Sequence, residues 1–137
     1  SDVCLPISLE RLGISVHCFM ADPEVARRAA EAGTTRAAAA VDQGAALWPE
    51  GIYAVGNAPT ALIRMAQLIR AGAMSPALIL AVPVGFVNVV ESKEEILALA
   101  RERGIPAIAA LGRKGGSTVA AALCNALLYQ SGGREKL

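Results

Sequence analysis

Three short glycine-containing segments combine residue types that bind small molecules. Each follows an apolar run and precedes a helical pattern: residues 56–60 (GNAPT), 83–87 (PVGFV) and 112–117 (GRKGGS). Backbone N–H groups at a helix start favour an anionic ligand. If the preceding apolar runs are parallel strands, all three junctions meet at one edge of a sheet, where open α/β proteins bind ligands. The sequence therefore predicts one ligand site built from three junctions.

The first junction offers close access to the backbone and a versatile polar side chain. Gly56 permits a tight turn, and the Asn57 amide both donates and accepts hydrogen bonds. Thr60 follows in the first turn of the predicted helix. The alternative interpretation is an ordinary helix start with Asn57 as its cap. A dinucleotide site is not supported, because the sequence lacks Gly-x-Gly-x-x-Gly at this junction.

The third junction is the most cationic of the three. Arg113 and Lys114 supply two positive charges, and the Ser117 hydroxyl stands at a helix start. Gly115 and Gly116 let a ligand approach the backbone. This combination suits a carboxylate or a phosphate, although a flexible solvated turn is the alternative. The spacing does not match the Gly-x-x-x-x-Gly-Lys-Ser/Thr loop of nucleotide-binding proteins.

The second junction is apolar. Gly85, Phe86 and Val87 follow a proline and a valine, and together they suit the wall of a pocket for a large, flat, apolar molecule. The alternative is a loop covered by a neighbouring subunit or helix, because exposed apolar patches also mark interfaces.

Two further side chains carry charge or can exchange protons. Arg36 lies at a helix start, where the helix dipole disfavours a cation, and an anionic ligand would relieve that conflict. An ordinary surface arginine is the alternative. His17 is the only histidine, but it lies within a predicted strand, so we expect a structural or surface role. Cys18 and Cys124 are expected to be small core residues.

Composition narrows the class of protein. The chain has 137 residues, 54% of them apolar, which fits a single folded domain over residues 1–137. A net charge of +1 predicts no nucleic-acid or membrane partner. Three scattered cysteines and one histidine predict no disulfide framework and no metal site, and they favour a reducing cytoplasm.

Capping signals mark several helices. Asp22 and Pro23 predict a helix that ends at Gly33, because Asp is a favoured cap, Pro fits the first turn and Gly favours a left-handed terminator. Ser92 and Glu95 match a capping box, which predicts a helix start at Ser92. The predicted helices cover residues 23–32, 35–47, 59–71, 92–103 and 117–129, with Thr34 or Thr35 capping the second.

Strands alternate with these helices. The continuous apolar run at residues 77–82 is typical of a strand covered on both faces. The other predicted strands cover residues 14–19, 52–55 and 107–111. Right-handed crossovers between such strands give a mainly parallel sheet with helices on both faces. The predicted fold class is therefore a three-layer, doubly wound α/β fold.

Five motifs occur in a recognisable order. They are residues 35–39 (TRAAA), 54–62 (AVGNAPTAL), 82–87 (VPVGFV), 91–93 (ESK) and 112–117 (GRKGGS). In this order the chain resembles the precorrin-8X methylmutase family, also called precorrin isomerase, from about His17 to Tyr129. The resemblance implies that these residues form the central and C-terminal part of a longer family fold.

The resemblance implies an isomerase of cobalamin biosynthesis. Members of the family move a methyl group from C-11 to C-12 of precorrin-8X or cobalt-precorrin-8, which gives hydrogenobyrinic or cobyrinic acid. They work as homodimers with the corrinoid substrate near the subunit interface, and they use no cofactor. The substrate carries many acetate and propionate groups, in agreement with the anion site predicted from the junctions.

The resemblance also implies roles for the junction residues. Six polar side chains hold carboxylates or the macrocycle: Arg36, Asn57, Thr60, Arg113, Lys114 and Ser117. Four glycines permit close approach, and two apolar residues line the pocket: Gly56, Gly85, Gly115 and Gly116, with Phe86 and Val87. The family histidine, thought to protonate a ring nitrogen, is not matched in this sequence, and His17 is not that residue.

Two other functions compete with the enzyme. A truncated, non-catalytic module that binds a corrinoid without converting it fits the same junctions. A nucleotide-binding protein rests only on the glycine-rich loop and on analogy of fold.

Overall fold

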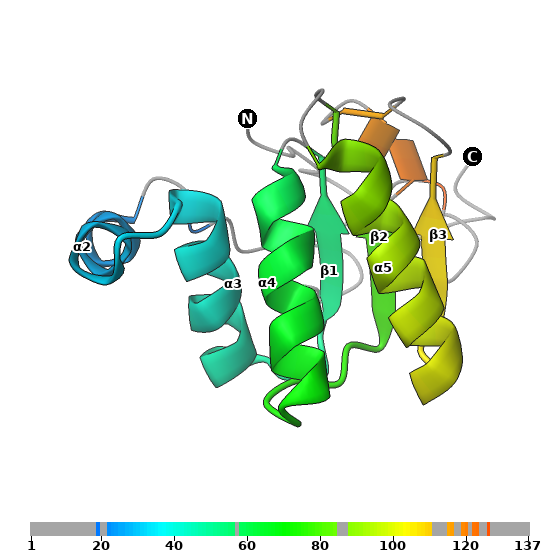
Figure 1. Ribbon diagram of the computed structural model, residues 1–137, viewed down its shortest axis with the longest axis horizontal. Helices are drawn as coiled ribbons and strands as arrows, with labels where there is room; N and C mark the ends of the chain where they lie inside the picture. The colour runs from blue at the N-terminus through cyan, green and yellow to red at the C-terminus, as the bar shows by residue number, and fades with distance from the viewer. Residues whose placement is uncertain are drawn as a thin grey trace, which may run out of the picture.

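A computed structural model shows an α/β fold (Figure 1). It describes residues 19, 22–56, 58–84, 88–110, 115–116, 119–120, 122–123 and 126. In chain order the elements are α2 (Pro23–Ala32), α3 (Arg36–Leu47), β1 (Ile52–Val55), α4 (Pro59–Arg70), β2 (Leu78–Ala81), α5 (Val89–Arg103) and β3 (Ala107–Ala109). The predicted strand at residues 14–19 lies outside the described part, apart from Phe19. The described residues of the predicted last helix, between 119 and 126, are helical.

The three strands form a parallel sheet in the order β1-β2-β3. Ile52 pairs with Leu78, and Ile79 pairs with Ala107. Because all strands run the same way, their carboxyl ends lie at one edge of the sheet, where α4 and α5 also begin (Figure 1). The predicted parallel sheet is therefore confirmed, and the described residues that directly follow the strands lie at its carboxyl edge.

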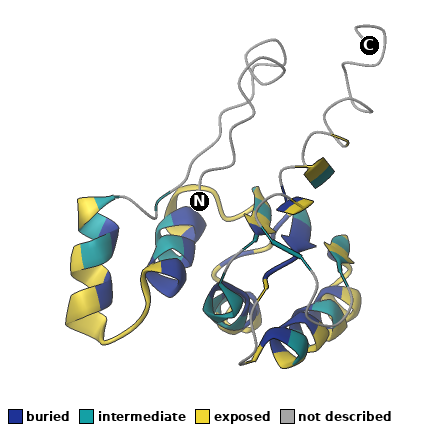
Figure 2. Ribbon diagram, turned by 90° about the horizontal axis from the view of Figure 1, so that it is seen from above, coloured by how far each residue is buried: buried dark blue, intermediate teal, exposed yellow. Residues whose placement is uncertain are grey.

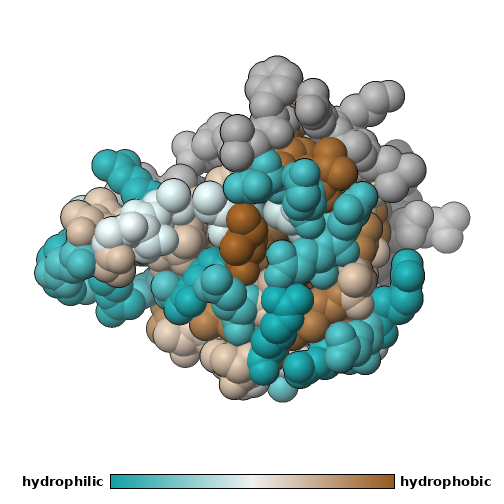
Figure 3. Space-filling view, in the orientation of Figure 1, coloured by the Kyte–Doolittle hydropathy of each residue, from teal (hydrophilic) through white to brown (hydrophobic). Residues whose placement is uncertain are grey.

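The main core lies between the sheet and α4 and α5. Leu62, Met65, Ala66 and Ile69 of α4 are buried, and their spacing puts them on one face of the helix. They belong to one cluster with strand residues that face α4 and α5, such as Ile79. The outer side of α4 and α5 is covered mainly by hydrophilic residues (Figure 3).

Helical residues also lie on the second face of the sheet. Figure 2 shows the described helical residues near the C-terminus on the side opposite α4 and α5, which makes three layers. Leu80 of the central strand points to this second face and is fully buried. Ile52 and Ile108, on the neighbouring strands, are 64% and 39% exposed. Burial on this face is therefore complete at Leu80, intermediate at Leu78 of the same strand and low at Ile52 and Ile108 of the neighbouring strands.

Helix α2 stands to the side of the sheet and packs against α3 through Val25, Ala29 and Ala39. Its predicted ends are confirmed. The Asp22 carboxylate accepts a hydrogen bond of 2.9 Å from the Glu24 backbone N–H, and Gly33 adopts a left-handed conformation with φ 65°.

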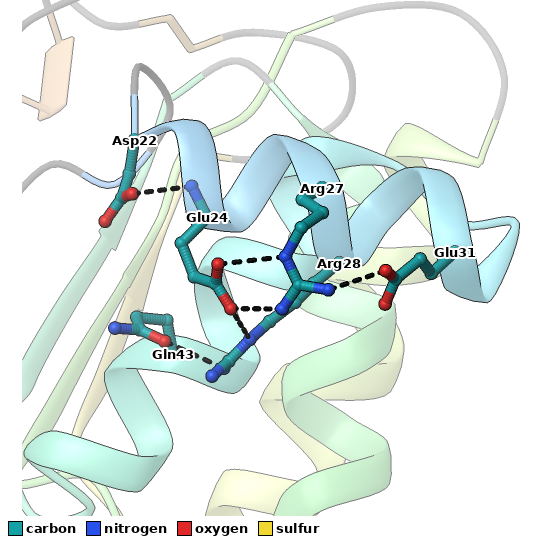
Figure 4. Close-up of polar contacts among 6 residues, drawn as sticks. All are labelled: Asp22, Glu24, Arg27, Arg28, Glu31 and Gln43. Atoms are coloured by element: carbon teal, nitrogen blue, oxygen red, sulfur yellow. Dashed lines mark hydrogen bonds and ion pairs between the residues drawn. The ribbon is translucent and has the colours of Figure 1, made fainter.

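The exposed side of α2 carries a small network of ion pairs (Figure 4). Arg27 contacts both Glu24 and Glu31, and its hydrogen bonds lower the pKa of Glu24 to about 2. Arg28 pairs with Glu24 and also donates a 2.9 Å hydrogen bond to Gln43 of α3. Exposed ion pairs contribute little to stability. The contact from Arg28 to Gln43 nevertheless links α2 to α3 outside their apolar contact.

The predicted start of α5 is wrong by three residues. The helix begins at Val89, after Asn88 in a left-handed conformation with φ 63°. Ser92 is therefore not a cap: it is buried within the helix, and its hydroxyl donates a 3.0 Å hydrogen bond to the Val89 carbonyl. Burial of the Val89 side chain explains the difference, because a start at Ser92 would remove Val89 from the apolar stripe.

Truncating the core of α4 should destabilise the protein. Leu62 is fully buried, and Leu62→Ala should lower the free energy of unfolding by about 2–5 kcal/mol. Leu47, at the end of α3, is 52% exposed and provides a matched control. Leu47→Ala should cost about 0.5 kcal/mol or less. Urea denaturation of both variants tests this, and equal losses would contradict the assigned core.

Candidate functional site

The starts of α3 and α4 lie side by side. Thr35 caps α3, where its hydroxyl accepts a 3.1 Å hydrogen bond from the Ala38 backbone N–H. The same hydroxyl lies 3.0 Å from the Thr60 hydroxyl, in the first turn of α4. Neither first turn contains an acidic residue. The partial positive charges of two helix ends therefore adjoin with no carboxylate of their own turns to offset them.

Three of the predicted site residues lie around this pair of helix starts. Arg36 is the first residue of α3; it is exposed and forms no ion pair with the residues that the structure describes. Gly56 directly follows β1, and Thr60 follows in α4. The charge conflict predicted for Arg36 is therefore present in the fold, because a cation stands at a helix N-terminus without an anionic partner.

The glycines of the third junction lie against the end of β2. The Gly116 backbone N–H donates a 2.7 Å hydrogen bond to the Val82 carbonyl. Gly115 has φ 146°, and a Cβ atom there would lie 2.1 Å from the same carbonyl oxygen. The expected close approach at Gly115 is thus met by protein backbone. The packing of the protein backbone is therefore enough to explain why this position lacks a side chain, with or without a ligand.

Seven predicted site residues lie outside the described part of the chain, and so does the only histidine. Their binding roles stay predictions: Asn57, Gly85, Phe86, Val87, Arg113, Lys114 and Ser117, with His17 beside them. The cap of α4 is Ala58, without a side-chain hydrogen bond. The alternative interpretation of Asn57 as the cap is therefore wrong by one residue, although the predicted helix start at Pro59 is confirmed.

An open surface cleft of about 440 Å³ lies beside the N-terminal halves of α3 and α4, which are in contact with each other below it. The residues along it are Gly33, Thr34, Thr35, Ala38, Thr60, Ile63, Arg64 and Gln67. From the sequence alone, no function was assigned to Arg64 and Gln67. A signal was present, because Thr60, Arg64 and Gln67 follow a spacing that puts them on one flank of a helix. What the sequence lacks is any sign that α3 faces this flank.

Lys93 is a buried cation that sequence reasoning missed. It is 3% exposed in α5, and burial lowers the pKa of its ammonium group. The buried positions Val89, Ser92, Lys93 and Ile96 follow the helical period, so the correct helix start would have revealed it. Burial also raises the pKa of Tyr53, whose hydroxyl donates a 2.7 Å hydrogen bond to the Trp48 carbonyl.

The described residues form neither a metal-binding cluster nor a membrane-spanning helix. They contain no group of three or more His, Cys, Asp or Glu side chains placed to hold a metal ion. None of their helices is both long and apolar enough to span a bilayer.

Comparison with protein families identifies one match over most of the chain. The sequence profile described as "Precorrin-8X methylmutase" matches residues 5–130. A cobalt-precorrin-8 methylmutase from Leptospira interrogans is 44% identical over 133 residues, which cover 94% of this chain and 60% of that protein. A precorrin-8X methylmutase from Pseudomonas aeruginosa is 44% identical over 112 residues, which cover 82% of this chain and 53% of that protein.

A solved structure shows the same fold. The precorrin-8X methylmutase from Thermus thermophilus aligns with a TM-score of 0.75 and 43% identity. The alignment covers 93% of this chain and 61% of the Thermus chain. This chain thus spans just over half the length of the Pseudomonas protein and about three-fifths of the Leptospira and Thermus proteins.

A side chain at Gly115 should disturb the junction. Gly115→Ala should lower the free energy of unfolding by about 3 kcal/mol, because the backbone angle costs about 1–3 kcal/mol and the forced contact with Val82 adds about 1–3 kcal/mol. Gly72 has φ 75° but open space around it, so it is the control. Gly72→Ala should cost about 1 kcal/mol. If both variants lost the same free energy of unfolding, the close contact with Val82 would make no contribution to the effect at Gly115.

The buried Lys93 should make stability depend on pH. Its pKa lies below the ordinary value of 10.5, so the unfolded chain keeps this proton to higher pH than the folded chain does. The free energy of unfolding should therefore rise as the pH approaches 10.5. Lys93→Met should remove that rise.

The raised pKa of Tyr53 acts in the opposite direction, because stability is then lost as the pH rises through the tyrosine range. The protein with Lys93 and the Lys93→Met variant are therefore both compared in a Tyr53→Phe background. Urea denaturation from neutral pH upward measures their free energies of unfolding. Parallel pH profiles for the two proteins would show that burial of Lys93 has no effect on its titration.

Proposed function

Because this chain belongs to the precorrin-8X methylmutase family, we propose that it acts as an isomerase of cobalamin biosynthesis. The reaction is migration of a methyl group from C-11 to C-12 of precorrin-8X or cobalt-precorrin-8. The product is hydrogenobyrinic acid, or cobyrinic acid when cobalt is present. The match over residues 5–130 is the observation that carries the proposal.

The edge of the sheet suits the chemistry of such a substrate. A corrinoid is a flat macrocycle with many carboxylate groups, so its binding site needs cations and hydrogen-bond donors around an apolar surface. Arg36 and the adjoining starts of α3 and α4 supply positive charge without a nearby acidic side chain in either first turn. Thr60 adds a hydroxyl at the same place. These groups support a polycarboxylate ligand more directly than a neutral one.

The roles of these residues are in binding and orientation. A methyl shift on a corrin framework is promoted by protonation of the ring, which needs an acid within hydrogen-bond reach. No residue of this sequence is assigned that role, since His17 lies in a predicted strand and outside the described residues. Binding and catalysis are therefore separable properties, and each needs its own assay.

Homodimerisation and a cytoplasmic location complete the proposal. Trp48 and Ile52 are large apolar side chains that are 41% and 64% exposed, and exposed apolar side chains are typical of residues at a protein interface. The cysteine content favours a reducing compartment.

The direct test is conversion of precorrin-8X by the purified chain, followed by the change in absorption spectrum. Formation of hydrogenobyrinic acid would support the isomerase. A stable spectrum of a bound corrinoid without conversion would instead favour the non-catalytic binding module. Absence of both binding and conversion would refute the proposed function.

Arg36 provides the sharpest prediction for substrate binding. Arg36→Gln should weaken binding of hydrogenobyrinic acid about tenfold, because a hydrogen bond to a charged group contributes about 1.5 kcal/mol or more. Arg101 is an exposed arginine in the last turn of α5, at the other end of that helix from the junctions, and Arg101→Gln is the control. Absorbance titration measures both affinities. An unchanged affinity for Arg36→Gln would remove this residue from the site.

A further inference from the structure

The cleft between α3 and α4 is lined by side chains suited to one carboxylate on a short aliphatic arm. Threonine hydroxyls, the Gln67 amide and the Arg64 guanidinium provide its polar surface, and Ala38 and Ile63 provide its apolar surface. None of the lining residues that the structure describes is acidic. Its volume of about 440 Å³ falls within the range of small-molecule pockets and exceeds the space that a lone ion needs.

Arg64 is held in place by Asp42, outside the cleft lining, and by Gln67, which lines the cleft. Its Nε donates a 2.7 Å hydrogen bond to the Asp42 carboxylate of α3, and its Nη1 donates one of 2.9 Å to Gln67. A guanidinium has five N–H donors, so three remain on the two terminal nitrogens beyond these contacts. Two donors on neighbouring nitrogens match the two oxygens of a carboxylate. The Arg64 side chain is 37% exposed, so solvent and ligands can reach it.

The surroundings of Arg64 add to the attraction for an anion. The hydroxyls of Thr35 and Thr60 meet beside the cleft, at the N-terminal ends of α3 and α4, where the two helix dipoles place partial positive charge. Asp42 offsets part of the Arg64 charge through their 2.7 Å contact, but it is not among the residues that line the cleft. The lining therefore presents a cation and two helix ends, and no acidic side chain, to a ligand carboxylate.

We propose that this cleft binds one acetate or propionate side chain of the tetrapyrrole, with Arg64 as the cationic partner of its carboxylate. The methylene groups of that side chain contact Ile63 and Ala38. Thr35 and Thr60 share one hydrogen bond, so the hydroxyl that accepts in that bond donates its own O–H to the carboxylate. This inference rests on the proposed function and adds a specificity-determining residue to it.

The test is titration of the 137-residue chain with hydrogenobyrinic acid, followed by absorbance. Arg64→Gln should raise the dissociation constant about tenfold, as expected for loss of a charge-assisted hydrogen bond. Arg70 lies on the same helix and pairs with Glu95 at 2.6 Å, away from the cleft lining, so Arg70→Gln is the matched control. The affinity of the control should stay within about twofold of the original, because Arg70 does not line the cleft and loss of an exposed ion pair has a small energetic effect.

A second variant keeps the test decisive if Arg64→Gln fails to fold. Gln67→Glu is nearly isosteric, changes an exposed position and can still accept the hydrogen bond from Arg64. It places a carboxylate of the protein itself at the cleft, so it should weaken binding by a similar factor through repulsion and competition for Arg64. Thermal unfolding of each variant confirms that it is folded.

The outcomes separate this inference from the proposed function. Binding by the unaltered chain, with unchanged affinity in the folded variants at positions 64 and 67, would overturn the inference and leave the proposed function intact. Failure of the unaltered chain to bind hydrogenobyrinic acid would overturn both. Loss of affinity in Arg64→Gln or Gln67→Glu, but not in Arg70→Gln, would establish the cleft as part of the binding site.

Discussion

The parallel pairing of β1, β2 and β3 is the constraint on which the position of the junctions depends. It sends three strand ends to the same edge of the sheet, and each following segment must begin there. Leu62 of α4 and Ile79 of β2 are buried in the same core cluster, which holds α4 in place against the sheet. The polar groups at the edge are therefore positioned by an apolar core that has no part in binding. This division lets a short sequence change alter the ligand without altering the fold.

Two polar contacts extend that order from α4 to α3. The Thr35 and Thr60 hydroxyls join the helix starts, and Asp42 joins Arg64 about two turns further along α3 and one turn further along α4. Together with the apolar contacts of Ala37 and Val41 in the main core cluster, they fix the distance between α3 and α4. The same contacts leave the cleft open between them. Stability of the pair and accessibility of Arg64 thus have a common origin.

The sequence predicted most elements because their signals are local. The Asp22 cap and the Gly33 terminator mark α2 within a dozen residues, and the apolar stripe of α4 is readable from its spacing alone. The start of α5 was missed because a capping-box pattern competed with burial of Val89, which depends on tertiary contacts. The cleft was missed for the same reason: Thr35 and Thr60 are 25 residues apart, and no local pattern brings them together. Binding by the junction residues stays a prediction, because most of them lie outside the described part of the chain.

The contact of Gly115 and Gly116 with the Val82 carbonyl has a consequence for redesign of the site. Loop grafting assumes that a loop can be exchanged as a unit while its anchor points stay fixed. Here one anchor lies inside the loop, because the backbone at Gly115 and Gly116 docks directly on the end of the neighbouring strand. A library that randomised residues 112–117 as a block would therefore mix changes in selectivity with failures to dock. Holding the two glycines constant while varying the cations beside them would confine the variation to ligand recognition.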